Sequence, residues 1–169
     1  MCATPLVERA LYGRTRRTCP ACGFVRFHDP KVAGIALITS GDRVLLIQRG
    51  VNPEKGKWAL PGGYMDAGEM PEPALRRELR EEIRLEVELL RFLDVFAIAA
   101  ATGAVLGIVL AYAASPAGGG WPQPAAEDDV ADARWFSVAE LPAELAFDST
   151  RSLLAAWSAQ QIEFSKESL

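Results

Sequence analysis

The sequence has no excess of positive charge. Its 18 lysine and arginine residues are outnumbered by 22 aspartate and glutamate residues, which gives a formal net charge of −4 and a pI near 5.1. Non-specific binding to nucleic acid depends on cationic side chains that neutralise phosphates. We therefore expect no nucleic-acid partner, and we expect local cations or a bound metal ion to hold any polyanionic substrate.

The sequence also lacks a secretion signal and is poor in cysteine. Residues 1–9 contain no basic region followed by an apolar run, so we expect a reducing cytoplasmic location. There are three cysteines, and Cys19 and Cys22 are separated by two residues. This spacing favours a metal knuckle over a disulfide framework.

One segment, residues 95–114, has no charged residue and contains two glycines four positions apart, Gly103 and Gly107. Twenty apolar residues are enough to cross a bilayer. However, Thr102 and Gly103 can turn the chain midway, no cationic anchor follows, and alanine replaces leucine over much of the run. We therefore expect two buried strands joined by a turn and no membrane partner, with a membrane span as the alternative.

The length of 169 residues and the 50% hydrophobic content suit one globular domain with a short appendage. Residues 1–30 are basic, bear cysteines and have few core-forming runs, so they indicate a small metal-stapled cap. The domain proper is expected over residues 31–169.

Hydrophobic patterns predict strands interleaved with helices after residue 30. A helix is expected after Gly63, with Leu75, Leu79 and Ile83 as its buried stripe. A polar link at 115–129 could form a lid. This order predicts a layered α/β or α+β domain. A second helix is expected at residues 149–163. Strands are expected at residues 32–39, 44–47, 58–60, 85–96, 105–113 and 134–138.

Three glutamates share one face of the first helix, because Glu78, Glu81 and Glu82 fall at i, i+3 and i+4. Like charges at these spacings repel by about 0.2–0.5 kcal/mol per pair, so a positive group is expected among them. Mg²⁺ is usually held by a few carboxylates together with water and phosphate oxygens. The alternative is a solvated acidic face, and two ion pairs are correctly spaced for it, Arg77 with Glu81 and Glu72 with Arg76.

A longer pattern resembles the Nudix box. That pattern is Gly, five residues, Glu, seven residues, Arg-Glu, aliphatic, any residue, Glu-Glu, any residue, Gly, aliphatic. In this chain the pattern starts at Gly63, continues at Glu69 and ends with residues 77–85, and only the final glycine is missing, replaced by Arg84. The many specified positions make a chance match improbable.

The resemblance implies an α/β/α sandwich with a mixed central sheet and a metal-dependent hydrolase. It implies that Glu78, Glu81 and Glu82 hold Mg²⁺ or Mn²⁺, with the Gly62 carbonyl as a further ligand. It also implies that Glu69 and Arg77 brace the loop against the helix. A metal-activated water would attack phosphorus, with Glu81, Glu82 or a loop carboxylate as the general base.

The leader resembles the zinc ribbon found in one branch of Nudix hydrolases, which includes NADH pyrophosphatases and FAD or ADP-ribose pyrophosphatases. This likeness implies a structural Zn²⁺ on Cys2, Cys19 and Cys22. Structural zinc normally has four ligands, and His28 is the only candidate for the fourth. A decayed zinc-ribbon-like remnant with free thiols is the alternative.

The substrate is expected to be a nucleoside diphosphate linked to another moiety. The Ser-Gln-Pro-Trp-type motif of the NADH-cleaving branch is absent, whereas residues 135–149 resemble the FAD and ADP-ribose type, so ADP-ribose or FAD is preferred. Arg49, at the end of the second strand, and Glu127 are candidate substrate-binding residues. The alternatives are an ordinary exposed arginine at a strand end and a solvated acidic turn at residues 127–129. A nucleoside triphosphate pyrophosphohydrolase and a non-catalytic nucleotide-sensing or nucleic-acid-binding module are the alternatives. Members of this family frequently pair, so a homodimer is possible.

Overall fold

The structure is a computed structural model, and it describes residues 2–100 and 102–162. Contacts divide the chain into two compact units, Met1–Pro30 and Lys31–Leu169. The first unit is a small antiparallel sheet in the order β1-β2-β3, formed by Val7–Leu11, Arg14–Thr18 and Val25–Arg26. Its first hairpin turns at Tyr12 and Gly13, which both have positive φ.

The second unit contains a six-stranded mixed sheet. Five strands run in the order β6-β5-β4-β8-β7, and the sixth strand, β9, pairs with β5 outside this order. Strands β4 and β8 are parallel, and the other pairs are antiparallel. The bounds are β4 Lys31–Ser40, β5 Arg43–Arg49, β6 Trp58–Ala59, α1 Pro71–Ile83, β7 Val87–Ala99, β8 Val105–Pro116, β9 Val130–Ser137, η1 Val138–Glu140 and α2 Asp148–Ser158.

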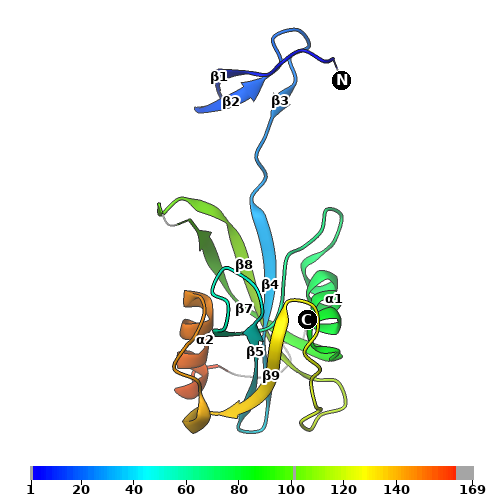
Figure 1. The fold of residues 1–169 in the computed structure, drawn as a ribbon, viewed down its shortest axis with the longest axis vertical. Helices are drawn as coiled ribbons and strands as arrows, with labels where there is room; N and C mark the ends of the chain where they lie inside the picture. Colours follow the sequence, from blue (N-terminus) through cyan, green and yellow to red (C-terminus); the bar gives the residue numbers. More distant parts are fainter. Residues whose placement is uncertain (1, 101, 163–169) are drawn as a thin grey trace. The chain divides into compact units, whose positions relative to one another are not determined.

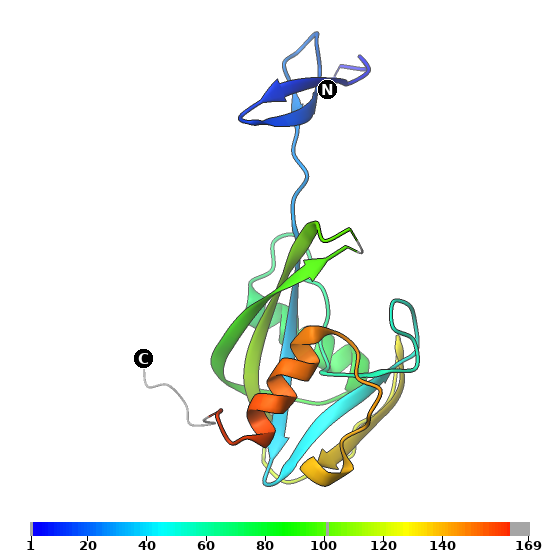
Figure 2. The same ribbon diagram turned by 90° about the vertical axis from the view of Figure 1, so that its left-hand side faces the viewer.

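Helices α1 and α2 cover opposite faces of this sheet (Figures 1 and 2). Alternate side chains of β5 point to the two faces. Leu45 and Ile47 pack in the core that contains Leu75 and Leu79 of α1, whereas the core on the other face contains α2 and is formed by Leu37, Val44, Leu46, Leu60, Ala111, Leu153, Leu154 and Trp157. The expected α/β/α sandwich with a mixed sheet is therefore confirmed.

The uncharged segment 95–114 forms parts of the paired strands β7 and β8. The chain reverses between them, where the Ala100 amide donates to the Ala104 carbonyl at 2.9 Å and the Gly103 amide donates to the Ala100 carbonyl at 2.8 Å. The expectation of two strands joined by a turn is confirmed, but the expectation that they are buried is wrong. Among the described residues of 95–110 only Gly107 is buried, and Val95, Val105, Leu106 and Ile108 are exposed, because β7 lies at the edge of the sheet. Within the described ranges, no helix is long and apolar enough to cross a membrane.

Two predicted boundaries differ from the structure by more than three residues. Strand β9 begins at Val130 rather than at residue 134, because its pairing with β5 extends back to Arg49. The second helix ends at Ser158, where the chain turns through Gln160 at φ 55°. The predicted end of that helix, residue 163, lies outside the described residues.

Candidate active site

The loop between β6 and α1, which contains Gly62 and Gly63, forms one wall of the site. The loop runs along β4, where the Gly34 amide donates to the Gly63 carbonyl and the Ala36 amide to the Pro61 carbonyl, both at 2.9 Å. Gly62 has φ 136°, and a Cβ there would lie 2.2 Å from the Gly34 carbonyl oxygen. Only glycine fits this close approach.

The two glycines of this loop meet glutamates of α1. The Gly62 amide donates to Glu82 Oε2 at 2.9 Å, and a Cβ on Gly63 would lie 2.2 Å from Glu78 Oε2. Unlike its two neighbours, the Gly62 carbonyl accepts no backbone hydrogen bond from the described residues. The sequence therefore needs both glycines to bring the backbone up to the carboxylates.

Helix α1 presents these carboxylates because its other side is anchored in the core. Leu75, Leu79 and Ile83 are fully buried. Two prolines occupy the first turn, where the missing amide donors cost little. Glu78 and Glu82 lie one turn apart on the side that faces the loop.

Arg77 connects the loop, the helix and the carboxylates. Its Nε and Nη2 donate to the two oxygens of Glu69 at 2.8 and 2.7 Å. Its Nη1 donates to Glu78 at 2.8 Å and to Glu81 at 3.0 Å, and Nη2 also donates to the Tyr64 carbonyl at 3.2 Å. Arg77 is thus the positive group expected among the glutamates, and it braces the loop as a two-pronged guanidinium can.

The Arg77–Glu69 pair stays ionised over a wide pH range. Hydrogen bonds from Arg77 and from the Asp66 amide lower the pKa of Glu69 to about 2. The same bond to Glu69, followed by the bond to Glu78, raises the pKa of Arg77. The brace therefore keeps its charges at any pH near neutrality.

The pKa values of the two glutamates that face the loop, Glu78 and Glu82, are raised rather than lowered. Glu82 is 8% exposed, and burial raises the pKa of its carboxyl to about 7, although the Gly62 amide opposes this shift. Burial also raises the pKa of Glu78. A buried carboxylate without a full counter-charge is a candidate ligand for a cation.

The donor set fits a hard divalent cation. Three carboxylates and the Gly62 carbonyl offer only oxygen, the donor that Mg²⁺ and Mn²⁺ prefer. Glu81 is the most accessible of the three, with 53% of its side chain exposed. The three carboxylates are spread out. Among the described residues, no set of three aspartate or glutamate side chains has its ligand atoms within 4.8 Å of one another. Both ion pairs of the solvated-face alternative are present as well.

Helix α1 ends in the left-handed conformation even though the box glycine is replaced. Arg84 has φ 50° and ψ 37°, and its amide donates to the Arg80 carbonyl at 3.1 Å. The Arg84 guanidinium pairs with Glu127 at 2.6 Å, and the Glu127 amide donates to the Glu82 carbonyl at 3.0 Å. The predicted substrate residue Glu127 thus lies at the end of α1 with its carboxylate engaged by Arg84.

The other predicted substrate residue, Arg49, lies at the end of β5. Its Nε donates to the Pro53 carbonyl at 2.8 Å, and its guanidinium lies 5.0 Å from the centre of the Phe147 ring. The charges of Arg49 and Asp129 both act on Glu82. Sequence reasoning missed Asp129, because an interaction between the ends of β5 and β9 leaves no local signal in the sequence.

The three cysteines of the first unit lie together. Cys2 Sγ is 3.3 Å from the sulfurs of both Cys19 and Cys22, and all three thiols are free. Within the described chain they are the only group of three or more metal-ligating side chains whose ligand atoms lie within 4.8 Å of one another. Hydrogen bonds from Thr4 lower the pKa of Cys2 to about 6. His28 is exposed and outside this group.

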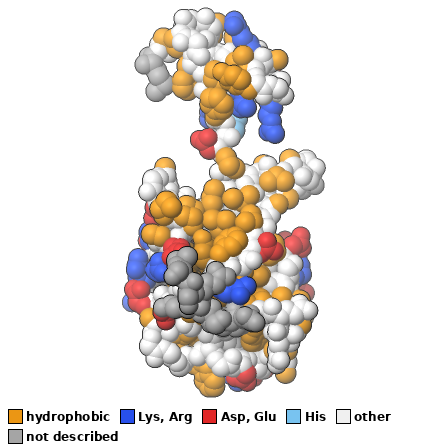
Figure 3. Space-filling view, turned by 180° about the vertical axis from the view of Figure 1, so that it is seen from behind, with side chains coloured by type: hydrophobic (Ala, Val, Ile, Leu, Met, Phe, Trp, Pro, Cys, Tyr) orange, Lys and Arg blue, Asp and Glu red, His pale blue; other side chains and the backbone are white. Residues whose placement is uncertain are grey.

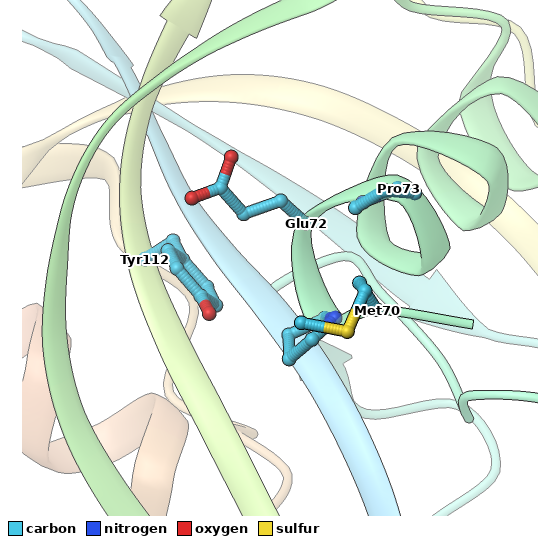
Figure 4. A pocket seen from close by; sticks show the side chains of 5 residues that line it. Met70, Glu72, Pro73 and Tyr112 are labelled. Carbon is cyan, nitrogen blue, oxygen red and sulfur yellow. The ribbon is translucent and has the colours of Figure 1, made fainter. Parts of the chain in front are cut away.

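A separate hollow of about 310 Å³ lies at the start of α1 (Figure 4). It is lined by Met70, Pro71, Glu72, Pro73 and Tyr112. Glu72 and Glu78 are six residues apart in the helix, so they point in directions about 120° apart. None of the predicted site residues lines this hollow.

Comparison with known proteins gives a consistent family. A family model described as the NUDIX domain matches residues 28–157. An ADP-ribose pyrophosphatase of Methanocaldococcus jannaschii is 37% identical over 121 residues, which cover 70% of this chain and 68% of that protein. An NAD-capped RNA hydrolase (NudC) of Stutzerimonas stutzeri is 32% identical over 145 residues, which cover 84% of this chain and 48% of that protein.

The crystal structure of a Nudix hydrolase from Nitrosomonas europaea matches with a TM-score of 0.79 at 22% identity, over 98% of this chain and 93% of that one. At this identity the likeness shows the fold. The chain spans about half the length of the NudC relative, whose name concerns RNA with an NAD cap. The expectations that exclude nucleic acid and disfavour NADH are therefore not confirmed. The matched domain, with the box from Gly63 to Leu85, shows that this chain belongs to the Nudix hydrolase family.

Proposed function

We propose that this protein is a metal-dependent hydrolase that cleaves the diphosphate linkage of a nucleoside diphosphate joined to another moiety, with ADP-ribose or FAD preferred. The observation that carries this proposal is the pairing of the buried Glu82 carboxylate with the Gly62 amide, next to Glu78. The name of the Methanocaldococcus relative supports ADP-ribose.

In this proposal Glu78, Glu81 and Glu82 hold Mg²⁺ or Mn²⁺ together with the Gly62 carbonyl. Such an ion offsets the charge of a diphosphate and lowers the pKa of a bound water. Arg77 and Glu69 fix the loop to the helix, so the ligands keep their spacing. A carboxylate of the cluster accepts the proton of the water that attacks phosphorus, and two phosphate-bearing products leave.

We place the other proposed roles around this centre. Arg49 contacts a substrate phosphate, because it ends β5 near Glu82, and Glu127 positions the end of α1. The cysteines of the leader, residues 1–30, hold Zn²⁺, and residues 31–169 form the catalytic domain. The proposed location is a reducing cytoplasm, and the apolar strands β7 and β8 are the proposed face of a homodimer.

A product-resolved assay with Mg²⁺ tests the proposal. The panel comprises ADP-ribose, FAD, NADH, NAD-capped RNA, diadenosine polyphosphates and nucleoside triphosphates. We expect ADP-ribose to give AMP and ribose 5-phosphate, with one oxygen of labelled water in one product. Pyrophosphate release from triphosphates, with no cleavage of linked diphosphates, would replace this proposal with the pyrophosphohydrolase alternative.

A further inference from the structure

The first unit, Met1–Pro30, has a charge opposite in sign to that of the rest of the chain. It contains five arginines and two acidic residues, which give +3, whereas the remaining 13 cationic and 20 acidic residues give −7. The net charge of −4 is therefore an average over two units of opposite sign. A basic segment on an acidic protein indicates a polyanionic ligand.

The strand register places these arginines opposite one another. Arg9 pairs with Arg16 across β1 and β2, and Arg17 pairs with Arg26 across β2 and β3. Like charges directly opposite in a sheet destabilise it. Because Arg14 and Arg16 are two residues apart on β2, both point to the same face as Arg9. One face of the sheet thus carries three arginines.

None of the five arginines has an acidic partner within the described part of the chain, whereas arginines of the second unit are widely paired, at positions 43, 76, 77, 80, 84, 134 and 151. The Nε of Arg16, like that of Arg91 in the second unit, is also buried without a hydrogen-bond acceptor among the described residues. The protein itself therefore leaves the charge of this cationic face uncompensated, and an external anion would balance it.

Exposed aromatic rings are interleaved with these charges. Tyr12 is 76% exposed, Phe24 46% and Phe27 53%, and the guanidinium of Arg16 lies 4.7 Å from the centre of the Phe27 ring. Cationic and apolar side chains are intermixed on the surface of this unit in Figure 3. Arginines that track a phosphate backbone beside rings that stack on bases are typical of single-strand binding surfaces.

We propose that the first unit binds single-stranded nucleic acid, with Arg9, Arg14 and Arg16 contacting phosphates and with Tyr12, Phe24 and Phe27 stacking on bases. An anionic membrane surface would also attract arginines, but it offers no planar rings for stacking. This inference is independent of the hydrolase proposal, and it contradicts the expectation from net charge alone.

Fluorescence anisotropy on the full chain tests the proposal, with an unstructured labelled oligonucleotide of about 12 nucleotides. The oligonucleotide carries a 5′ hydroxyl, and no Mg²⁺ or chelator is added. We expect Arg9→Gln with Arg14→Gln to weaken binding at least about tenfold and to flatten the slope of log affinity against log salt by about 1.4. The matched control, Arg134→Gln with Arg151→Gln, removes two exposed arginines from the second unit and should change affinity less than about twofold.

A second variant separates stacking from charge. Tyr12→Ser with Phe24→Ser should weaken binding of both RNA and DNA of the same sequence without changing the salt slope. Equal affinity in the wild type and the arginine variant would overturn the proposal, as would tighter binding to phosphatidylglycerol vesicles than to either oligonucleotide. Since the oligonucleotide has no diphosphate linkage, failure here leaves the proposed hydrolysis untouched.

Discussion

Glu82 carries the largest electrostatic cost in the site. Burial raises the pKa of its carboxyl from 4.5 to about 7, so the folded protein keeps this proton to a higher pH than the unfolded chain. Between these two pH values the native state binds more protons, and the free energy of unfolding falls as pH rises. At about 1.4 kcal/mol per pKa unit, the loss approaches roughly 3 kcal/mol above neutrality.

Removing the charge at this position should therefore stabilise the metal-free protein. We expect Glu82→Gln to raise the free energy of unfolding at about pH 8 by up to roughly 3 kcal/mol and to change it little at about pH 4. Urea denaturation at both pH values, without divalent metal, measures the difference. An equal effect of the substitution at the two pH values would contradict the burial of an ionisable carboxyl here.

Gly63 is tied to the position of the Glu78 side chain. A Cβ at this glycine would lie 2.2 Å from Glu78 Oε2, so Gly63→Ala must displace that carboxylate. We expect turnover to fall at least about tenfold while the free energy of unfolding changes by about 1 kcal/mol or less. Steady-state kinetics and denaturation check both numbers. Gly103→Ala, in the distant β7–β8 turn, should leave turnover unchanged.

At the level of elements, the C-terminal end of α1 shows how the departure at Arg84 is accommodated. A residue other than glycine in the left-handed conformation costs about 1–2 kcal/mol, and an exposed ion pair such as Arg84 with Glu127 returns about 0–1 kcal/mol. We expect Arg84→Gly to raise the free energy of unfolding by about 0.5–1 kcal/mol, with turnover unchanged. Thermal denaturation with kinetics tests this, and a less stable variant would mean that the ion pair dominates.

Helix α1 and the β7–β8 hairpin were predictable because their signals are local. Leu75, Leu79 and Ile83 repeat every four residues, and Thr102-Gly103 interrupts an apolar run. The hydrogen bond from the Gly50 amide to the Asp129 carbonyl was not predictable, since it depends on the pairing of β5 with β9. The three strands of the leader were missed because arginines on both faces hide the alternation of a half-buried strand.

At the level of the whole molecule, the two units should respond differently to loss of zinc. We expect about one Zn²⁺ per chain in metal-replete protein, and none after Cys19→Ser. The substitution should unfold the leader, seen as lost amide signals for residues 2–30, but leave hydrolysis of ADP-ribose within about twofold of wild type. Elemental analysis and amide spectra test this. Zinc-free wild-type protein with an ordered leader would contradict the zinc assignment.

At this scale the overall net charge is a weaker guide to ligands than the hydrophobic periodicity is to the fold. The sandwich followed from periodicity and the box, both of which survive in the structure. Net charge excluded nucleic acid only by averaging the basic residues 1–30 with the acidic remainder. The division of the chain into two units, rather than its composition, shows where the uncompensated arginines lie.

The central claim is that the carboxylates of α1 form a metal-dependent catalytic site. The most direct measurement is the initial rate of ADP-ribose cleavage with Mg²⁺ for the wild type, Glu82→Gln and the control Glu72→Gln, which lies on the same helix. We predict AMP and ribose 5-phosphate from the wild type, a loss of at least about a thousandfold in Glu82→Gln, and less than about a twofold change in Glu72→Gln. Wild-type turnover by Glu82→Gln would contradict the account.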